Sequence, residues 1–299
     1  MENAIECRGV FKKYPHFTLD SIDLLVPTGS VMGFVGPNGA GKSTTLRIIM
    51  GLVHQDRGTV SVLGHSMPAA QIAAKWDIGF VSEDMRLHPG QTIDFHLRFL
   101  ASIYPNWDAA YADVLLSRFG LIASQRIKGL SHGQRVKASI LMALARKPRL
   151  LVFDEPTTGL DPQARHQILD EMSAVLADAD RSILFSSHNT LDVEQISDQI
   201  TFIDAGQILF SEDKETLLER WRRIRLEVPD GYSLPVIPGI ESIQRNGHIA
   251  TLTVSAFRDG FCEALSQAGA TVSRVDRLTL EEIFLTNVPM HGMQKKEAA

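Results

Sequence analysis

The apolar positions of the first 65 residues fall in short runs separated by turns, which predicts short strands. The last of these runs, residues 58–64, has the pattern of an edge strand. Residues 150–155 differ, because their unbroken apolar run ends in two carboxylates. Such a run is typical of a central parallel strand that is buried on both faces. Residues 183–185 predict a further apolar strand.

From residue 86 onward the period of the apolar positions becomes helical. A first helix has apolar residues at i, i+4 and i+7, namely Ile93, Leu97 and Leu100. Pro105 ends this helix. Asp108 is placed to cap a second helix that reaches residue 119, and Ser131 a third that reaches residue 146. The first helix has more apolar side chains than one buried stripe requires, so either all of them pack internally or some form a docking surface.

Beyond residue 199 the pattern changes again. An apolar hairpin over 199–210 precedes a charged helix over 213–223, which we expect to act as a linker. Asn246-Gly247 is a strong hairpin turn signal within a small α/β appendage. The elements expected there are strands 223–228, 240–244, 248–255 and 271–275, and helices 257–267 and 278–284. The chain from residue 290 is expected to be a disordered tail.

Composition limits the classes of protein to consider. The 299 residues suffice for one large and one small domain. A formal net charge of -5 argues against a nucleic-acid scaffold, which would need a basic stripe. Two cysteines, Cys7 and Cys262, provide no disulfide framework and suit a reducing cytoplasm. No apolar run approaches the ~20 residues that span a bilayer, and residues 1–3 do not begin a signal peptide, so any membrane association is expected to come through a partner.

A glycine-rich loop matches every fixed position of the pattern G-x-x-x-x-G-K-[ST] between a predicted strand and a predicted helix. Its residues are Gly36, Pro37, Asn38, Gly39, Ala40, Gly41, Lys42, Ser43 and Thr44, followed by Thr45. The glycines let backbone N–H groups surround phosphates, and the helix adds its positive dipole end. We expect Lys42 to contact the terminal phosphates and the Ser43 hydroxyl to ligate Mg²⁺.

Asp154 and Glu155 follow the central apolar strand, and Pro156 ends it. Ligands of open α/β sheets bind at the carboxyl ends of the strands, so this carboxylate pair should lie beside the phosphate loop. We expect Asp154 to hold the metal, directly or through water, and Glu155 to act as general base toward the attacking water. Solvated strand-end acids are the alternative, but a complete phosphate loop nearby disfavours it.

The pentapeptide Leu130-Ser131-His132-Gly133-Gln134, one helix upstream of the strand that ends in Asp154-Glu155, resembles the signature of the ATP-binding cassette (ABC) family. The resemblance covers roughly the first 215 residues. It implies an α/β P-loop NTPase cassette with a mixed-sheet core, an antiparallel β subdomain and a helical subdomain over about 86–148. The expected domains are therefore the nucleotide-binding domain 1–215, the small C-terminal α/β domain 222–289 and the tail 290–299.

The resemblance also implies roles for individual residues. The nucleotide, ATP, is expected at the phosphate loop and at Ser131, His132, Gly133, Gln134 and Asp161, the last lying in a segment similar to the family's D-loop. His188 resembles the switch histidine that senses the γ-phosphate. Tyr14 resembles the aromatic residue that stacks on adenine, with Phe11 and Phe17 as nearby competitors.

Two positions depart from the family pattern. Glu83 stands where a glutamine is usual; its carboxylate can still ligate Mg²⁺ or orient water in catalysis, but it adds negative charge near the triphosphate. His132 replaces the first signature glycine, and His tolerates unusual backbone geometry less freely than Gly. The expectation is that Ser131 and Gly133 preserve the γ-phosphate contact.

The resemblance implies partners as well. One phosphate loop and one signature require a second cassette, either in a homodimer or as a paralogous cassette. Residues 104–108 and 278–285 resemble acetoin-utilisation and bacitracin-resistance exporter subunits with separate permease chains, although residues 278–285 could equally be a spacer helix. We therefore expect an exporter ATPase, peripheral at the cytoplasmic face of the inner membrane, with transmembrane permease subunits and no nucleic acid. The alternatives are a soluble ABC ATPase acting on nucleic acid or the ribosome, and a regulatory ABC protein with weak turnover.

Overall fold

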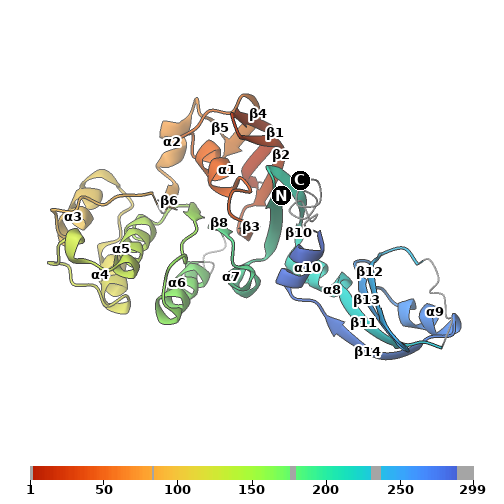
Figure 1. The fold of residues 1–299 in the computed structure, drawn as a ribbon. Helices are drawn as coiled ribbons and strands as arrows, with labels where there is room; N and C mark the ends of the chain where they lie inside the picture. Colours follow the sequence, from red (N-terminus) through yellow and green to blue (C-terminus); the bar gives the residue numbers. More distant parts are fainter. Residues whose placement is uncertain (1–2, 83, 176–179, 230–236, 288–299) are drawn as a thin grey trace, which may run out of the picture. The chain divides into compact units, whose positions relative to one another are not determined.

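The computed structural model describes residues 3–82, 84–175, 180–229 and 237–287. The chain divides into two compact units, Met1–Ser211 and Glu212–Ala299, each of which is described by itself below (Figure 1). The division falls four residues before the position 215 suggested by the sequence. Glu83 and the tail from residue 290 lie outside the described residues.

An antiparallel sheet begins the first unit, with strand order β2-β1-β4-β5. Its strands are β1 (Asn3–Tyr14), β2 (Phe17–Pro27), β4 (Arg57–Val62) and β5 (His65–Met67). β2 alternates buried and exposed residues along Ile22–Val26, as a strand with one face on a core must. The prediction that residues 58–64 form an edge strand was wrong, because the short β5 pairs with the outer side of β4.

The second sheet of this unit has strand order β10-β9-β3-β8-β7-β6. Its strands are β3 (Val31–Val35), β6 (Ile78–Ser82), β7 (Leu150–Asp154), β8 (Ser182–Ser187), β9 (Gln199–Asp204) and β10 (Gln207–Asp213). β3 pairs in parallel with β8 and β9, and β7 pairs in parallel with β6 and β8. Every residue of β3, β7 and β8 is buried, which confirms the prediction for residues 150–154. Because these strands are parallel, their carboxyl ends meet at one edge.

Helix α1 (Lys42–Ile49) lies between the two sheets and contacts both β4 and β7 (Figure 1). Leu46 and Ile49 of this helix are buried in a core cluster that also includes Val60 and Val152 from the two sheets. Among the other helices, α2 (Gln71–Lys75) contacts β5 and β6, and α7 (Thr190–Ile196) contacts β3 and β8. Helix α6 (Pro162–Val175) contacts α7. The shared core fixes the start of α1, and with it the phosphate loop, against both sheets.

The predicted helical segment consists of α3 (Ile93–Ile103), α4 (Ala109–Arg118), the 3₁₀ turn η1 (Ile127–Gly129) and α5 (His132–Leu144). The Asp108 carboxylate accepts a hydrogen bond from the Tyr111 N–H at 2.8 Å, so Asp108 caps α4. Ser131 caps α5. Helices α3 and α4 both contact α5, which makes α5 the centre of this segment.

The second unit contains a four-stranded antiparallel sheet with strand order β12-β13-β11-β14. Its elements are α8 (Lys214–Arg220), β11 (Arg222–Glu227), β12 (Ile240–Asn246), β13 (Ile249–Val254), α9 (Phe261–Gln267), β14 (Thr271–Arg277) and α10 (Leu280–Asn287). Ile224, Leu252 and Leu265 belong to its own core. Helix α9 begins four residues later than predicted, because Gly260 adopts a left-handed φ of 83° just before it. Within the described ranges, no helix combines the length and the apolar character needed to cross a membrane.

Candidate active site

The phosphate loop connects β3 to α1, and two of its glycines are required by their surroundings. Gly41 has a φ of 112°, and a Cβ atom added there would lie 2.9 Å from Leu19 Cδ1 and from Phe17 Cζ. A Cβ atom at Gly36 would lie 2.2 Å from the carbonyl oxygen of Ile203. A side chain at Gly36 would collide with the backbone of β9, and one at Gly41 would be strained by its φ and would displace Leu19 and Phe17 of β2. The motif glycines therefore shape the loop itself.

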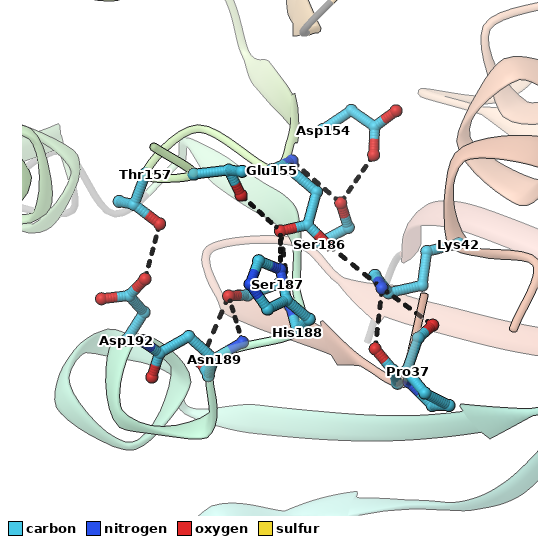
Figure 2. Close-up of polar contacts among 12 residues, drawn as sticks. Pro37, Lys42, Asp154, Glu155, Thr157, Ser186, Ser187, His188, Asn189 and Asp192 are labelled. Carbon is cyan, nitrogen blue, oxygen red and sulfur yellow. Dashed lines mark hydrogen bonds and ion pairs between the residues drawn. The ribbon is translucent and has the colours of Figure 1, made fainter. Parts of the chain in front are cut away.

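Lys42 begins α1, and its side chain is 5% exposed. Its ammonium donates hydrogen bonds to the carbonyl oxygens of Gly36 at 2.7 Å and Pro37 at 3.2 Å. It also forms an ion pair with Glu155, with 3.1 Å between Nζ and Oε1 (Figure 2). The ammonium is thus held between the phosphate loop and the carboxylate that follows β7.

Asp154 is the last residue of β7 and is 6% exposed. Its Oδ1 accepts hydrogen bonds from the hydroxyls of Ser43 at 3.0 Å and Ser186 at 2.7 Å. Ser43 and Asp154 thus place two oxygen ligands side by side, a donor set that suits Mg²⁺. No cluster of three or more His, Cys, Asp or Glu side chains able to hold a metal occurs among the described residues, so an ion at Ser43 and Asp154 would need phosphate or water oxygens as well.

Ser186 was not assigned a separate role from the sequence, yet it contacts both carboxylate residues. Besides donating to Asp154, its hydroxyl accepts the backbone N–H of Glu155 at 3.0 Å. Ser186 is fully buried and lies directly opposite Asp154 across the β7–β8 ladder. One hydroxyl therefore orients the Asp154 carboxylate and anchors the backbone from which Glu155 projects.

Glu155 adopts a left-handed φ of 52°, which turns its side chain out of the strand direction and toward Lys42. Its Oε2 accepts hydrogen bonds from the Thr158 hydroxyl at 2.9 Å and lies 2.7 Å from His188 Nδ1 (Figure 2). Burial raises the pKa of this carboxyl, but the charge and hydrogen bond of Lys42, with hydrogen bonds from His188 and Thr158, outweigh it. The pKa of Glu155 consequently lies below its ordinary value, and the carboxylate is ionised near neutral pH.

The pocket over the phosphate loop has a volume of about 490 Å³. Lys42, Ser43, Thr44 and Glu155 line one part of it, and His16 and Phe17 of the β1–β2 hairpin line another. Tyr14 pairs with Phe17 across that hairpin and is 36% exposed. Phe17, which the sequence offered as a competitor of Tyr14, thus lies at the pocket, and so does His16. No motif singles out His16, because its position depends on how the hairpin packs on the loop.

The signature residues form the first turn of α5. Ser131 and Gln134 make a capping box, in which the Ser131 hydroxyl accepts the Gln134 N–H at 3.2 Å and the Gln134 side chain accepts the Ser131 N–H at 2.9 Å. His132 is helical, so glycine is not required there and the predicted conflict with its backbone geometry does not arise. Its Nε2 lies 3.1 Å from the Thr158 carbonyl oxygen. His132 therefore links the signature to the segment that follows Glu155.

Asp161 has a structural partner of its own. Its carboxylate accepts the Ala164 N–H at 2.9 Å at the start of α6, and it is not among the described residues that line the phosphate pocket. The neighbouring segment is held by Asp192, which is 1% exposed and accepts hydrogen bonds from Thr157 at 2.6 Å and Arg165 at 2.5 Å. Thr157 is thus tied to α7 through the buried Asp192, which also pairs with Arg165 of α6.

Comparison with known proteins agrees with this geometry. Residues 19–158 match the family model of the ABC transporter. The Nod factor export ATP-binding protein I of Cupriavidus metallidurans is 34% identical over 213 residues, which are 69% of this chain and 70% of that protein. The ABC transporter ATP-binding protein YtrB of Bacillus subtilis is 26% identical over 268 residues, 89% of this chain and 91% of that protein.

Among solved structures, an ATP-binding subunit of an ABC transporter matches with a TM-score of 0.66 and 27% identity, covering 72% of this chain and 92% of that one. These matches confirm the resemblance carried by the phosphate loop, the signature and the paired carboxylates. The chain belongs to the ATP-binding proteins of ABC transporters, a family of ATPases.

Proposed function

We propose that this protein is the ATP-hydrolysing subunit of a bacterial ABC exporter and drives a separate transmembrane permease by ATP-dependent dimerisation. The observation that carries the proposal is the convergence of Lys42, Ser43, Asp154, Glu155 and His188 at the phosphate loop. These residues provide the charged and polar groups used in phosphoryl transfer. They are two carboxylates, a hydroxyl, a histidine and the buried ammonium of Lys42, the first residue of α1. The export function named for the Cupriavidus metallidurans relative supports the direction of transport.

In the proposed mechanism Lys42 and the loop N–H groups bind the β- and γ-phosphates. Ser43 and Asp154 would hold Mg²⁺, which would neutralise charge on the phosphate oxygens. Glu155 takes a proton from the attacking water, and His188, 2.7 Å from the same carboxylate, keeps it oriented. A triphosphate that draws the Lys42 ammonium away from Glu155 would raise the pKa of that carboxyl and make it a stronger base.

A second cassette completes the site. Ser131 and Gly133 lie at the start of α5, where the hydroxyl proton of Ser131 and the N–H groups of the first turn suit a γ-phosphate. With one phosphate loop and one signature per chain, two-fold symmetry makes each signature face the loop of the partner, in a homodimer or with a paralogous cassette. Hydrolysis removes the γ-phosphate contacts and shifts the pair toward an open state.

The permease is proposed to dock beside α5. A groove of about 430 Å³ there has apolar lining from Met85, Leu87 and Val136 and cations from Arg86 and Arg135. This composition suits a short amphipathic helix with acidic residues on its rim. His132 also lines the groove, so a helix in it would lie against the residue that contacts the segment after Glu155. Through such a docked helix, the ATPase would associate peripherally with the cytoplasmic face of the inner membrane.

Helix α3 has both buried and exposed apolar side chains. Ile93 and Leu97 are buried, whereas Phe95 and Phe99 are 41% and 54% exposed with their rings stacked. The possibility that all the apolar residues of this helix pack internally is therefore wrong for these two rings. The two rings are exposed apolar surface of the kind that a permease helix would cover.

Two other functions have less support. A soluble ABC ATPase for nucleic acid lacks support, because the described residues between Lys42 and Ser131 form short strands and helices and not the long coiled coil that DNA-repair members carry. A regulatory protein with weak turnover would follow if His132, or Glu83, which is proposed to act near Mg²⁺ and the attacking water, impaired hydrolysis. The rate of ATP hydrolysis by the purified chain separates this possibility from the proposed function.

The dimer is tested with Ser131→Arg in the Glu155→Gln background. The added side chain should block the partner's γ-phosphate, so that ATP-driven dimerisation measured by light scattering is lost while ADP binding is retained. Ser117→Arg, at an exposed serine of α4, is the matched control and should dimerise normally. An ATP-dependent dimer of the Ser131→Arg protein would reject the two-cassette site.

A further inference from the structure

The sheet of the second unit has one face that is rich in arginine. Its other face packs in the core around Ile224 and Leu226, and α9 contributes Phe261 and Leu265 to that core. Arg223 and Arg225 alternate with the buried residues along β11, so their side chains project from the opposite face. A hollow of about 560 Å³ lies on this face, and its lining includes Arg223, Arg225, Gln244, Arg245, Thr251 and Arg274.

The charges around this hollow are unbalanced. Asp276 is the one carboxylate of its lining among the described residues, against four guanidinium groups. Asp276 pairs with Arg274 at 2.8 Å, and Glu282 of α10 pairs with Arg223 at 2.9 Å. Within the part of the chain that the structure describes, the Arg225 side chain has neither an ion pair nor a hydrogen bond. A positive charge therefore remains at the centre of the face.

The strand register brings two of these positive charges together. Arg225 of β11 lies directly opposite Arg274 of β14, and Thr251 of β13 lies opposite Arg225 on its other side. Like charges in directly opposed positions of an antiparallel sheet destabilise the pair. An anion between the two guanidinium groups would turn this repulsion into two charge-assisted hydrogen-bonding contacts.

We propose that this hollow binds a small phosphate-bearing anion, at a site separate from the phosphate loop. Guanidinium groups match the geometry of phosphate oxygens through paired N–H donors, and Thr251 and Gln244 add neutral hydrogen-bonding groups around them. The volume of about 560 Å³ lies within the range of small-molecule pockets. The lining comes from all four strands of the sheet face, whereas an acidic peptide that adds a strand would use one edge.

The test uses the full-length chain saturated with ADP, so that the phosphate loop is filled, and equilibrium dialysis against labelled inorganic pyrophosphate. Wild-type protein should bind about one further equivalent of pyrophosphate, more weakly as the salt concentration rises. Arg225→Gln and Arg274→Gln should each weaken this binding about tenfold, the size expected for one charged hydrogen-bonding contact. Arg258→Gln makes the same charge change at an exposed position outside the hollow and should bind like wild type.

A second measurement separates binding from a structural role. If Arg225 serves a ligand, Arg225→Gln relieves the repulsion with Arg274 and should leave the urea midpoint of unfolding unchanged or raise it. A lowered midpoint together with unaltered pyrophosphate binding would overturn the proposal. Equal binding by wild type and the Arg225→Gln, Arg274→Gln double variant would overturn it as well. So would binding of a glutamate octapeptide or of phosphatidylglycerol vesicles that pyrophosphate does not displace.

Discussion

Replacing Ser186 by alanine tests whether one buried hydroxyl organises both carboxylate residues of the active site. The substitution removes the donor to Asp154 Oδ1 at 2.7 Å and the acceptor of the Glu155 N–H at 3.0 Å. Ser186 is fully buried, so water cannot readily replace either contact. Asp154 keeps its hydrogen bond from Ser43, and Glu155 keeps its contacts with Lys42 and His188. The fold should survive while both carboxylates lose their shared anchor.

The size of the effect follows from the two lost contacts. A buried N–H left without an acceptor costs about 1–3 kcal/mol, and a hydrogen bond to a carboxylate contributes about 1.5–3 kcal/mol. Because the two contacts share one atom and the site can relax, we expect the free energy of unfolding to fall by about 2–4 kcal/mol. Turnover should fall about tenfold or more, since displacing a catalytic group by a fraction of an ångström costs rate.

Ser182→Ala is the matched control. Ser182 lies at the other end of the same strand, is 1% exposed, and accepts the Gly29 N–H at 2.9 Å. It should lose stability in urea unfolding through one orphaned N–H but retain wild-type turnover. The two measurements are the rate of ATP hydrolysis and the urea midpoint of unfolding of both variants. Wild-type turnover in Ser186→Ala, or an equal loss of turnover in Ser182→Ala, would refute the positioning role.

Two further predictions concern the ionisation of Glu155 and the proposed permease groove. The pKa of Glu155 is lowered in the folded protein, so the ionised carboxylate stabilises the fold at pH values above 4.5, the ordinary pKa of this group. This stabilisation is lost as the pH falls through the folded-state pKa. Lys42→Met removes the ammonium, so burial becomes the main influence on the pKa of Glu155. An NMR titration should then show a higher pKa for Glu155 than in the wild type. An unchanged pKa would contradict the role of the ion pair. Arg86→Glu should weaken co-purification with the permease while the basal ATPase activity stays unchanged. The control, Arg126→Glu, changes an exposed position outside the groove and should co-purify like wild type. Equal co-purification of the two variants would place the docking surface elsewhere.

The parts of the site that the sequence predicted are those that local chain chemistry determines. The phosphate loop is continuous in sequence, and its glycines, Lys42 and Ser43 follow from one strand-loop-helix connection. Asp154 and Glu155 were found because a buried apolar strand ending in carboxylates is unusual beside such a loop. Capping chemistry likewise placed Asp108 and Ser131 correctly.

The parts that were missed depend on contacts between distant segments. Ser186 meets Asp154 only because β7 and β8 are neighbours in register, and His16 reaches the pocket only because the β1–β2 hairpin packs on the phosphate loop. The edge assignment for residues 58–64 was wrong because a strand as short as β5 leaves little periodic signal. His132 was expected to tolerate the signature's backbone geometry less freely than glycine, but it lies in the first turn of α5, where the backbone is helical.

The central claim is that this chain hydrolyses ATP with Glu155 as the general base. Glu155→Gln tests it most directly, because the amide has nearly the size of the carboxylate but cannot accept the proton. We predict that single-turnover hydrolysis of labelled ATP falls about 10²-fold or more while ATP affinity is retained. Hydrolysis near the wild-type rate by the Glu155→Gln protein, with ATP bound, would contradict the account.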